Sequence, residues 1–214
     1  MAIKVFLAND RVLFADGLCA LLEAQRDIKV VGRAMKGYEA VKRVQKLRPD
    51  IAILDSGLPE LNGFEASSQI RVLSPTTDTV ILSTSASPEY VYRALQAGAK
   101  AYLPKESSGA ELVAAVRTAN AGKRYLSKMI TATIVDDYVN DNRPKFPLES
   151  LTHRERHVLQ LIVEGKSSAQ TAKVLALSTK TVETYRSRIR QKLGIHDLPH
   201  LVKFAIRQGL TTLE

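Results

Sequence analysis

The stretch IAILDSGLPELNGFEASSQIRVL (51–73) contains the two elements from which the N-terminal part of the chain is built. Its first four residues are apolar and are followed by Asp55, a pattern typical of a parallel strand buried on both faces. From about residue 62 onward, apolar residues recur at helical spacing. A buried strand, a loop and an amphipathic helix in this order predict one unit of an α/β fold.

The same alternation of apolar runs and amphipathic segments occurs five times within residues 1–122. Ser87-Pro88-Glu89, and the pair Ser108 and Glu111, have the composition of helix N-termini. We therefore predict a flavodoxin-like, doubly wound parallel sheet of five strands in the order 2-1-3-4-5, with helices on both faces. The predicted strands are 3–8, 28–34, 51–55, 79–83 and 101–103, and the predicted helices are about 12–24, 36–47, 62–73, 87–97 and 108–121.

The C-terminal third of the chain has a different pattern. Residues 127–140 predict one further helix, and 141–149 contain Asn, Asp and two prolines, a composition typical of a linker. Beyond this linker no strand pattern occurs, and capping signals at Thr152 and Ser178 indicate helices. The predicted helices are 152–164, 168–175, 179–193 and 201–207, and the predicted parts of the chain are a domain over 1–122, a linker with a helix over 123–148 and a small all-α domain over 149–214.

Composition excludes several classes of protein. No apolar run approaches the ~20 residues that a membrane span needs. The N-terminal residues MAIKVFLANDR have the pattern of a strand rather than of a signal peptide, and the single Cys19 cannot form an internal disulfide. We expect a cytoplasmic protein with no membrane partner. Residues 149–214 carry 11 Lys and Arg against 6 Asp and Glu, which fits either a polyanionic partner or an ordinary solvated surface.

Polar side chains follow four of the five predicted strands. In the predicted strand order, strands 1 and 3 are neighbours, so Asp10 and Asp55 share a pocket at the carboxyl edge of the sheet. Two carboxylates attract a hard divalent cation, for which Mg²⁺ is the best candidate. Ser83 offers a hydroxyl and Lys105 a positive charge, both of which suit a phosphoryl group held on a carboxylate.

Three segments, PDIAILDSGLPELNGFE (49–65), ILSTSAS (81–87) and GAKAYLPKES (98–107), resemble the receiver domain of two-component response regulators. The resemblance covers residues 1–122 and implies that Asp55 is the phosphoacceptor, served by a sensor histidine kinase or a small phosphodonor. It also implies that Tyr102 is an aromatic switch that turns inward when Ser83 moves. The alternative for Tyr102 is a half-buried strand aromatic. The remaining implied roles are Mg²⁺ ligation by Asp10, Asp55 and the backbone carbonyl of Gly57, and contact with phosphoryl oxygens by Ser83 and Lys105.

One position departs from the family pattern. Receiver domains usually have two adjacent acids after the first strand, and this chain has Asn9-Asp10. Asn9 can still reach a metal ion through a bound water, but it removes one negative charge from the site, and sites of this kind weaken as ligand charge falls. The hypothesis is weaker Mg²⁺ affinity with altered rates of phosphorylation or dephosphorylation. Arg11 either places a further cation near the phosphate or is simply solvated.

Residues 151–210 resemble the LuxR-type helix-turn-helix along their whole length, with landmarks such as Leu151-Thr152, Gly165 and Thr181-Val182. A receiver followed by this module is the pattern of NarL/FixJ-type regulators. At 100° per residue, one face of the predicted helix 179–193 is apolar and should be core: Val182, Tyr185, Ile189 and Leu193. The opposite face and its flanks are the candidate DNA contacts: Lys180, Glu183, Thr184, Ser187, Arg188, Arg190, Gln191 and Lys192.

The resemblance points to Glu183, Thr184 and Ser187 as the residues that face bases. A carboxylate at position 183 can accept a hydrogen bond from cytosine N4, so Glu183 is predicted to set sequence preference. The alternative is that Glu183 pairs with a nearby arginine. The apolar stripe of the last predicted helix either mediates dimerisation or belongs to the core.

Together these features predict a transcriptional regulator that binds double-stranded DNA as a homodimer after phosphorylation of Asp55, with RNA polymerase as a further candidate partner. One alternative keeps DNA binding but places control in a ligand or partner at an atypical receiver, and Asn9 is the feature that favours it. An enzyme is not expected. Phosphatases with an aspartyl-phosphate intermediate commonly have an acid where Gly57 stands, and no glycine-rich dinucleotide motif follows the first strand.

Overall fold

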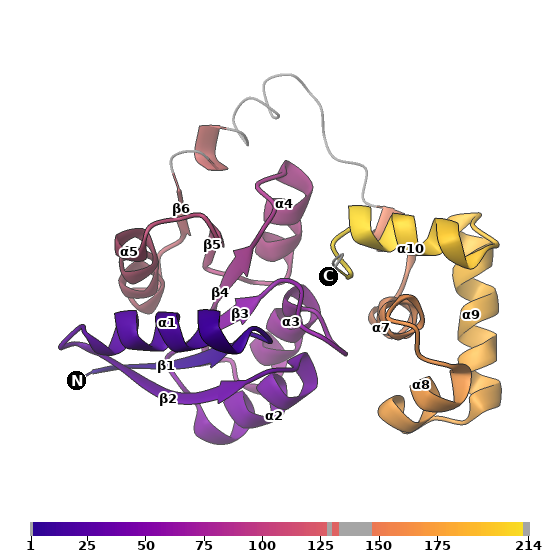
Figure 1. Cartoon of the computed structure of the whole chain (residues 1–214), viewed down its shortest axis with the longest axis horizontal. Coiled ribbons are helices and arrows are strands. Elements are labelled where there is room, and N and C mark those ends of the chain that lie inside the picture. The colour runs from indigo at the N-terminus through magenta and orange to yellow at the C-terminus, as the bar shows by residue number, and fades with distance from the viewer. Residues whose placement is uncertain (1, 128–129, 133–146, 212–214) are drawn as a thin grey trace. The chain divides into compact units, whose positions relative to one another are not determined.

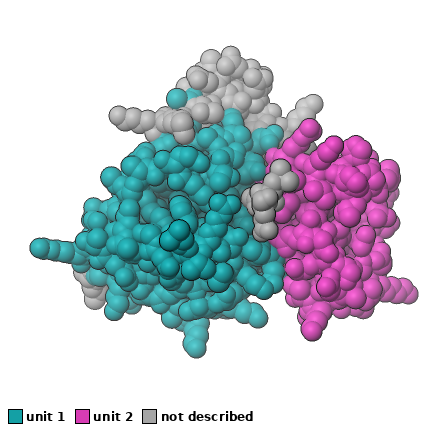
Figure 2. All heavy atoms as spheres, viewed as in Figure 1, with its two compact units in different colours: residues 1–144 teal, residues 145–214 magenta. Residues whose placement is uncertain are grey.

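The computed structural model describes residues 2–127, 130–132 and 147–211 (Figure 1). The chain divides into two compact units, residues 1–144 and 145–214, and each is described by itself (Figure 2). Within the described ranges, none of the helices combines the length and the apolar character required to cross a membrane.

The first unit contains the predicted parallel sheet. All pairings are parallel, and the predicted order of the first five strands is confirmed. The sheet has six strands rather than five, because two residues after the last helix pair with the neighbouring strand. A two-residue strand is too short to produce a periodic pattern, so the sequence placed these residues in the linker. In chain order the strands are β1 (Ile3–Ala8), β2 (Ile28–Ala34), β3 (Ile51–Asp55), β4 (Asp78–Ser83), β5 (Ala101–Pro104) and β6 (Tyr125–Leu126), and the sheet order is β2-β1-β3-β4-β5-β6.

Five helices connect these strands, and their start signals explain where they begin. Ser108 forms the predicted capping box with Glu111. Ser87 stands at the N-cap before Pro88, although its hydroxyl makes no capping bond and instead accepts a 3.2 Å hydrogen bond from Ser85 Oγ. The helices are α1 (Val12–Glu23), α2 (Gly37–Leu47), α3 (Gly63–Leu73), α4 (Pro88–Gln96) and α5 (Gly109–Asn120).

Two hydrophobic cores lie on opposite faces of the sheet. Helices α2, α3 and α4 cover one face, and α1 and α5 cover the other. On β3, Ala52 and Leu54 belong to the first core, whereas Ile51 and Ile53 belong to the second. Because side chains alternate along a strand, Asp55 continues the row toward α1 and α5, and the next residue continues the row toward α3 and α4. Two adjacent residues at the end of β3 therefore face different helix layers.

In the described part of the second unit, all secondary-structure elements are helices, joined by short turns. Thr152 forms the predicted capping box with Glu155, and Ser178 accepts from the Thr181 amide at the start of the longest helix. The last helix begins three residues before its predicted start, because Asp197 caps it and Pro199 occupies its first turn. The elements are η1 (Pro147–Ser150), α7 (His153–Val163), α8 (Ser168–Leu175), α9 (Thr179–Leu193) and α10 (Leu198–Arg207).

The core of this unit confirms part of the predicted apolar face of α9. Val182 and Ile189 are fully buried, whereas Tyr185 and Leu193 are only partly buried. On α10, Leu201 and Ala205 are buried and the helix packs on α7, so these two residues of its apolar stripe belong to the unit's own core. Residues 130–132 are helical, and the rest of the helix predicted over 127–140 lies mostly outside the described residues, as does most of the predicted linker.

Candidate functional sites

The register of the central strands brings the predicted acidic pocket together. Ala8 of β1 pairs with Leu54 of β3, so Asn9 and Asp55 are the next residues along two adjacent strands. The Asn9 side chain donates through Nδ2 to Asp55 Oδ2 at 2.6 Å, and both side chains are nearly inaccessible to solvent. Asp55 Oδ1 accepts from the Gly57 amide at 3.0 Å. The buried carboxylate is thus held from two sides.

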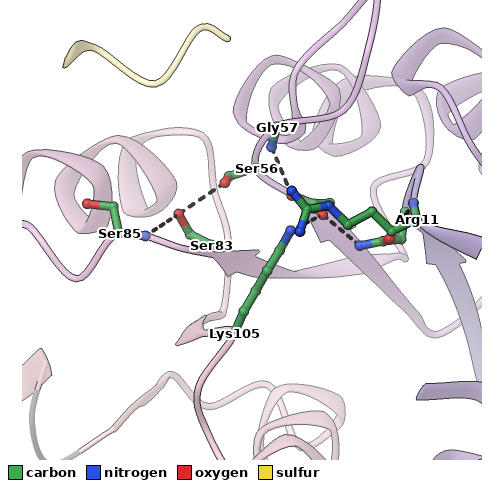
Figure 3. Close-up of polar contacts among 8 residues, drawn as sticks. Arg11, Ser56, Gly57, Ser83, Ser85 and Lys105 are labelled. Atoms are coloured by element: carbon green, nitrogen blue, oxygen red, sulfur yellow. Dashed lines mark hydrogen bonds and ion pairs between the residues drawn. The ribbon is translucent and has the colours of Figure 1, made fainter. Parts of the chain in front are cut away.

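Lys105 supplies the positive charge of this pocket. Its ammonium donates to Asp55 Oδ2 and forms an ion pair with that carboxylate, and the Lys105 side chain is only 14% exposed (Figure 3). Its backbone amide donates to the Ser83 carbonyl at 2.7 Å, which extends the pairing of β5 with β4 by one residue. The ammonium also lies 5.7 Å from the centre of the Phe14 ring on α1, within cation–π range. The pairing of β5 with β4 therefore fixes the backbone position from which the Lys105 side chain reaches Asp55.

The orientation of the Asn9 amide follows from its second partner. The Arg11 backbone N–H, which can only donate, contacts Asn9 Oδ1 at 2.8 Å. The NH₂ group must then face Asp55, as the distance of 2.6 Å indicates. Asn9 therefore forms a hydrogen bond with Asp55, whereas an aspartate at position 9 would repel it. Asp10 is half-buried and Arg11 is exposed; in the view of Figure 3 the Arg11 side chain extends across the pocket.

The donor set fits a Mg²⁺ ion that is held partly by water and by a bound phosphate. Mg²⁺ commonly takes one or two carboxylates and keeps several waters. Asp10 and Asp55 offer two carboxylates, and Gly57, which has a backbone carbonyl, follows Asp55 by two residues. Among the described residues, no group of three or more His, Cys, Asp or Glu side chains is placed so that it could hold a metal ion. Asp55 Oδ2 is already hydrogen-bonded, so a cation at that oxygen has to replace existing donors.

Three serines and a tyrosine form a hydrogen-bonded group beside Asp55. Ser56 Oγ donates to Ser83 Oγ at 3.0 Å, and the Ser85 amide donates to the same oxygen at 3.2 Å (Figure 3). The Tyr102 hydroxyl donates to the Ser85 carbonyl. Burial raises the pKa of the Tyr102 phenol well above its usual value, against an opposing hydrogen bond with Ser83. Tyr102 is fully buried rather than half-buried, and its phenol stays protonated.

Ser56 was missed by the sequence reasoning. Asp55 pairs with Leu82 in the β3–β4 register, and the Ser56 amide donates to the Leu82 carbonyl at 2.8 Å. One step further along both chains, Ser56 and Ser83 stand opposite each other. The sequence predicts which strands are neighbours but not their register, so this pair could not be inferred from it.

In the helical unit, all eight predicted DNA-contacting residues are exposed on α9. The Thr184 hydroxyl donates within α9 to the Lys180 carbonyl at 3.0 Å, and the side chains of Glu183 and Lys192 contact other helices. The Glu183 carboxylate accepts from the Ser168 hydroxyl on α8 and lies 3.9 Å from Arg186 Nη1, which itself donates to Ser168 at 2.8 Å. Arg186 was not predicted to take part. Glu183 therefore has both an arginine neighbour and a tie to the preceding helix.

Lys192 has a partner in the interior of the unit. Its ammonium lies 2.7 Å from Oε2 of Glu155, whose side chain is only 3% exposed. Although burial opposes the charged form, hydrogen bonds from Lys192 and Thr152 hold the pKa of Glu155 below its usual value. The ion pair joins the end of α9 to the start of α7.

Comparison with known proteins agrees with this architecture. Residues 5–117 match the response regulator receiver domain, and residues 149–205 match the LuxR family of bacterial regulatory proteins. The oxygen regulatory protein NreC of Staphylococcus epidermidis is 34% identical over 214 residues, covering 97% of this chain and 98% of NreC.

Two solved structures resemble the chain. A LuxR-family two-component response regulator from Aurantimonas sp. SI85-9A1 has a TM-score of 0.63 at 29% identity, covering 65% of this chain and 99% of that one. The response regulator ChrA of a heme-sensing two-component system has a TM-score of 0.54 at 26% identity and covers 98% of both chains.

Proposed function

Because the chain belongs to the response regulators that join a receiver domain to a LuxR-type DNA-binding domain, we propose that phosphorylation of Asp55 controls its binding to DNA. We divide the chain into a receiver over 1–122, a linker over 123–148 and a DNA-binding domain over 149–214. The observation that carries the proposal is the buried Asp55 carboxylate, 3% exposed and in contact with the Lys105 ammonium. A sensor histidine kinase in the cytoplasm, or a small acyl phosphate, is the phosphodonor.

The transfer is a displacement at phosphorus. One oxygen of the Asp55 carboxylate attacks the phosphorus, a P–O bond forms, and the bond to the donor's histidine nitrogen or acyl oxygen breaks with its electron pair. Asp10, Asp55 and the Gly57 carbonyl would hold Mg²⁺, which supplies positive charge against the phosphoryl oxygens. Lys105 contacts the carboxylate before the reaction and pairs with a phosphoryl oxygen afterwards, because formation of the acyl phosphate removes the charge of the carboxylate.

Ser83 and Tyr102 connect this chemistry to the rest of the protein. The Ser83 hydroxyl contacts the phosphoryl group, and the position of Tyr102 changes the face formed by α4, β5 and α5. The full burial of Tyr102 supports a population shift, in which phosphorylation stabilises an arrangement that the unphosphorylated protein already adopts. Changes on that face then hold or release the DNA-binding domain.

The exposed side of α9 is the proposed DNA-reading surface. Glu183, Thr184 and Ser187 face bases in the major groove, and the exposed basic residues contact phosphates. We assign Lys192 a structural role, because its ammonium is paired with the buried Glu155. The remaining proposed contacts are Lys180, Arg188, Arg190 and Gln191. The protein binds paired half-sites as a homodimer and acts on transcription together with RNA polymerase.

Phosphate-affinity electrophoresis with acetyl phosphate and Mg²⁺ tests the proposal. Wild-type protein should give a retarded band that Asp55→Ala lacks. Asp50→Ala is the matched control, since Asp50 is an exposed aspartate that precedes the same strand and accepts from the Lys4 amide at 2.7 Å. The phosphorylated protein should then bind a selected duplex more tightly than the unphosphorylated protein. A band that persists in Asp55→Ala would contradict the assignment of the acceptor.

A second candidate function is DNA binding under the control of a ligand or partner rather than of phosphate. The hydrogen bond from Asn9 favours it, because the Asp55 carboxylate is satisfied by Asn9, Gly57 and Lys105 without a cation. Failure of both acetyl phosphate and a panel of histidine kinases to modify the protein would select this candidate.

A further inference from the structure

Ser56 and Ser83 form a buried hydroxyl pair directly beside the proposed phosphoacceptor. Ser56 is 5% exposed and Ser83 is inaccessible to solvent. Their Oγ atoms are 3.0 Å apart, with Ser56 as the donor. The pair lies on the face of the sheet that α3 and α4 cover, whereas Asp55 belongs to the row facing α1 and α5. The two hydroxyls thus stand between Asp55 and the side of the sheet where Tyr102 is buried.

The hydrogen bonds around Ser83 determine the direction of its own proton. A serine hydroxyl has two acceptor lone pairs and one donor proton. The Ser56 hydroxyl and the Ser85 amide, at 3.0 and 3.2 Å, occupy both acceptor positions of Ser83 Oγ. The Ser83 proton is therefore left to donate. Phosphoryl oxygens only accept hydrogen bonds, so a serine arranged in this way matches them before they arrive.

The same group reaches Tyr102 by two routes, directly through the hydrogen bond between Ser83 and the Tyr102 phenol and indirectly through Ser85. Ser85 donates its amide to Ser83 and accepts the Tyr102 hydroxyl at its carbonyl. A change at Ser83 Oγ therefore alters the backbone unit that anchors the phenol of Tyr102. Ser56 lies at the other end of this chain of hydrogen bonds, one residue from Asp55.

We propose that Ser56 is a positioning residue of the switch, which orients the Ser83 hydroxyl as a donor and so couples the state of Asp55 to Tyr102. Its action on a phosphoryl group rests on the proposed function, but its action on Ser83 and Tyr102 does not. Ser56 touches neither the phosphodonor nor the reacting oxygen in this scheme; it acts through Ser83. Removing the Ser56 hydroxyl leaves one acceptor position of Ser83 Oγ empty, so that only the Ser85 amide still restricts the direction of the Ser83 proton.

Fluorine NMR of protein labelled with 3-fluorotyrosine tests the proposal without any phosphodonor. Tyr102→Phe identifies the Tyr102 resonance among the seven tyrosines. Ser56→Ala and Ser83→Ala should each move that resonance, and the double variant should move it no further than Ser83→Ala alone. Ser56→Thr keeps a hydroxyl and should stay close to wild type.

A buried hydroxyl pair elsewhere in the receiver provides the control. Ser67 Oγ lies 2.6 Å from Thr79 Oγ1, and both residues are buried between α3 and β4. Ser67→Ala should lower stability but leave the Tyr102 resonance in place. Unchanged resonances of the other tyrosines show that the variants fold. A Tyr102 resonance that does not respond to Ser56→Ala, or a shift that adds in full to that of Ser83→Ala, would overturn the proposal.

A second measurement separates this inference from the proposed function. With acetyl phosphate and Mg²⁺, Ser56→Ala should lower the phosphorylated fraction relative to the unphosphorylated one by about fivefold, the effect of one ordinary hydrogen bond. Ser56→Thr should restore it. If wild-type protein takes up no phosphoryl group, the proposed function fails, and the fluorine spectra still decide the role of Ser56. Equal phosphorylation of wild type and Ser56→Ala would remove Ser56 from the transfer.

Discussion

The side-chain amide of Asn9 donates a 2.6 Å hydrogen bond to the carboxylate of Asp55. Receiver domains usually have a carboxylate at the position of Asn9, where it would repel Asp55 unless a cation lay between them. With an amide, the two side chains attract each other without a metal ion. The replacement therefore changes both the charge that a cation meets and the stability of the site before the cation binds.

Asn9→Asp should increase Mg²⁺ affinity by roughly tenfold, because a second carboxylate adds ligand charge at close range. It should also make the metal-free protein less stable, since the hydrogen bond to Asp55 becomes a repulsion. Calorimetric titration with Mg²⁺ and urea unfolding measure the two effects. Asn120→Asp, an exposed position at the end of α5, adds the same charge far from the pocket and should leave the Mg²⁺ affinity unchanged. Equal Mg²⁺ affinities of wild type and Asn9→Asp would refute this account.

Lys192→Met should destabilise the protein by about 2 kcal/mol at neutral pH, because the buried Glu155 carboxylate loses a charged hydrogen bond. The pKa of Glu155 is lowered in the folded protein, so its contribution is present above its unfolded pKa of about 4.3 and is lost as pH falls through the folded pKa. The difference between wild type and Lys192→Met should therefore shrink in acid. Urea unfolding over a pH series checks this, with the exposed Arg190→Met as control. A difference that is the same at all pH values would rule out the ion pair as its cause.

Lys192→Met and Arg190→Met should also differ in the salt dependence of DNA binding. If Arg190 contacts a phosphate, Arg190→Met should reduce the slope of log affinity against log salt by roughly 0.9. Lys192→Met should leave that slope unchanged, because its ammonium is already paired with Glu155. Fluorescence anisotropy on one duplex across a salt series provides the slopes. A reduced slope for Lys192→Met would return that residue to the DNA-contacting set.

Glu60 adopts a left-handed backbone conformation, with φ of +67°, in the loop between β3 and α3. Its carboxylate lies 2.7 Å from the Lys36 ammonium. Both Glu60→Gly and Glu60→Ala lose this ion pair, but only glycine removes the steric cost of the left-handed region. Glu60→Gly should therefore be more stable than Glu60→Ala by about 1 kcal/mol in urea unfolding. Equal stabilities would show that this backbone position is not strained.

Glu183→Gln should change which sequences the protein prefers more than how tightly it binds. A neutral amide accepts more weakly from cytosine N4, so discrimination at one base pair should fall by roughly 1–3 kcal/mol. Selection from a random duplex library measures preference, and binding to a non-specific duplex measures general affinity. Ser168→Ala removes the hydroxyl that holds Glu183 and should blur the same base preference. An unaltered selected sequence would leave Glu183 as a helix-surface residue tied to Ser168 and Arg186.

Much of the fold could be predicted because continuous apolar runs and capping residues are local signals. The strand order followed from the rules of parallel sheets, and it explains why Asp55 and Lys105 were expected at one edge. The two-residue strand β6 was missed because it has no period. Contacts such as Ser56 with Ser83, or Glu155 with Lys192, depend on register and on side-chain direction across elements. These are set by tertiary packing, which a single sequence does not display.

Asp55, the last residue of β3, and Ser56, the residue after it, point to opposite faces of the sheet. This arrangement restricts changes in the length of the loop before β3. Deleting one codon between α2 and β3 would shift the strand by one residue and exchange the two faces. The apolar run is continuous, so such a shift would still bury aliphatic side chains on both sides. The carboxylate, however, would turn away from Lys105, and a serine would take its place. A length change in this loop would thus put a serine beside Lys105 and bury the carboxylate where Leu54 now lies in an apolar core, so the loop length itself helps to keep both the pocket and the core intact.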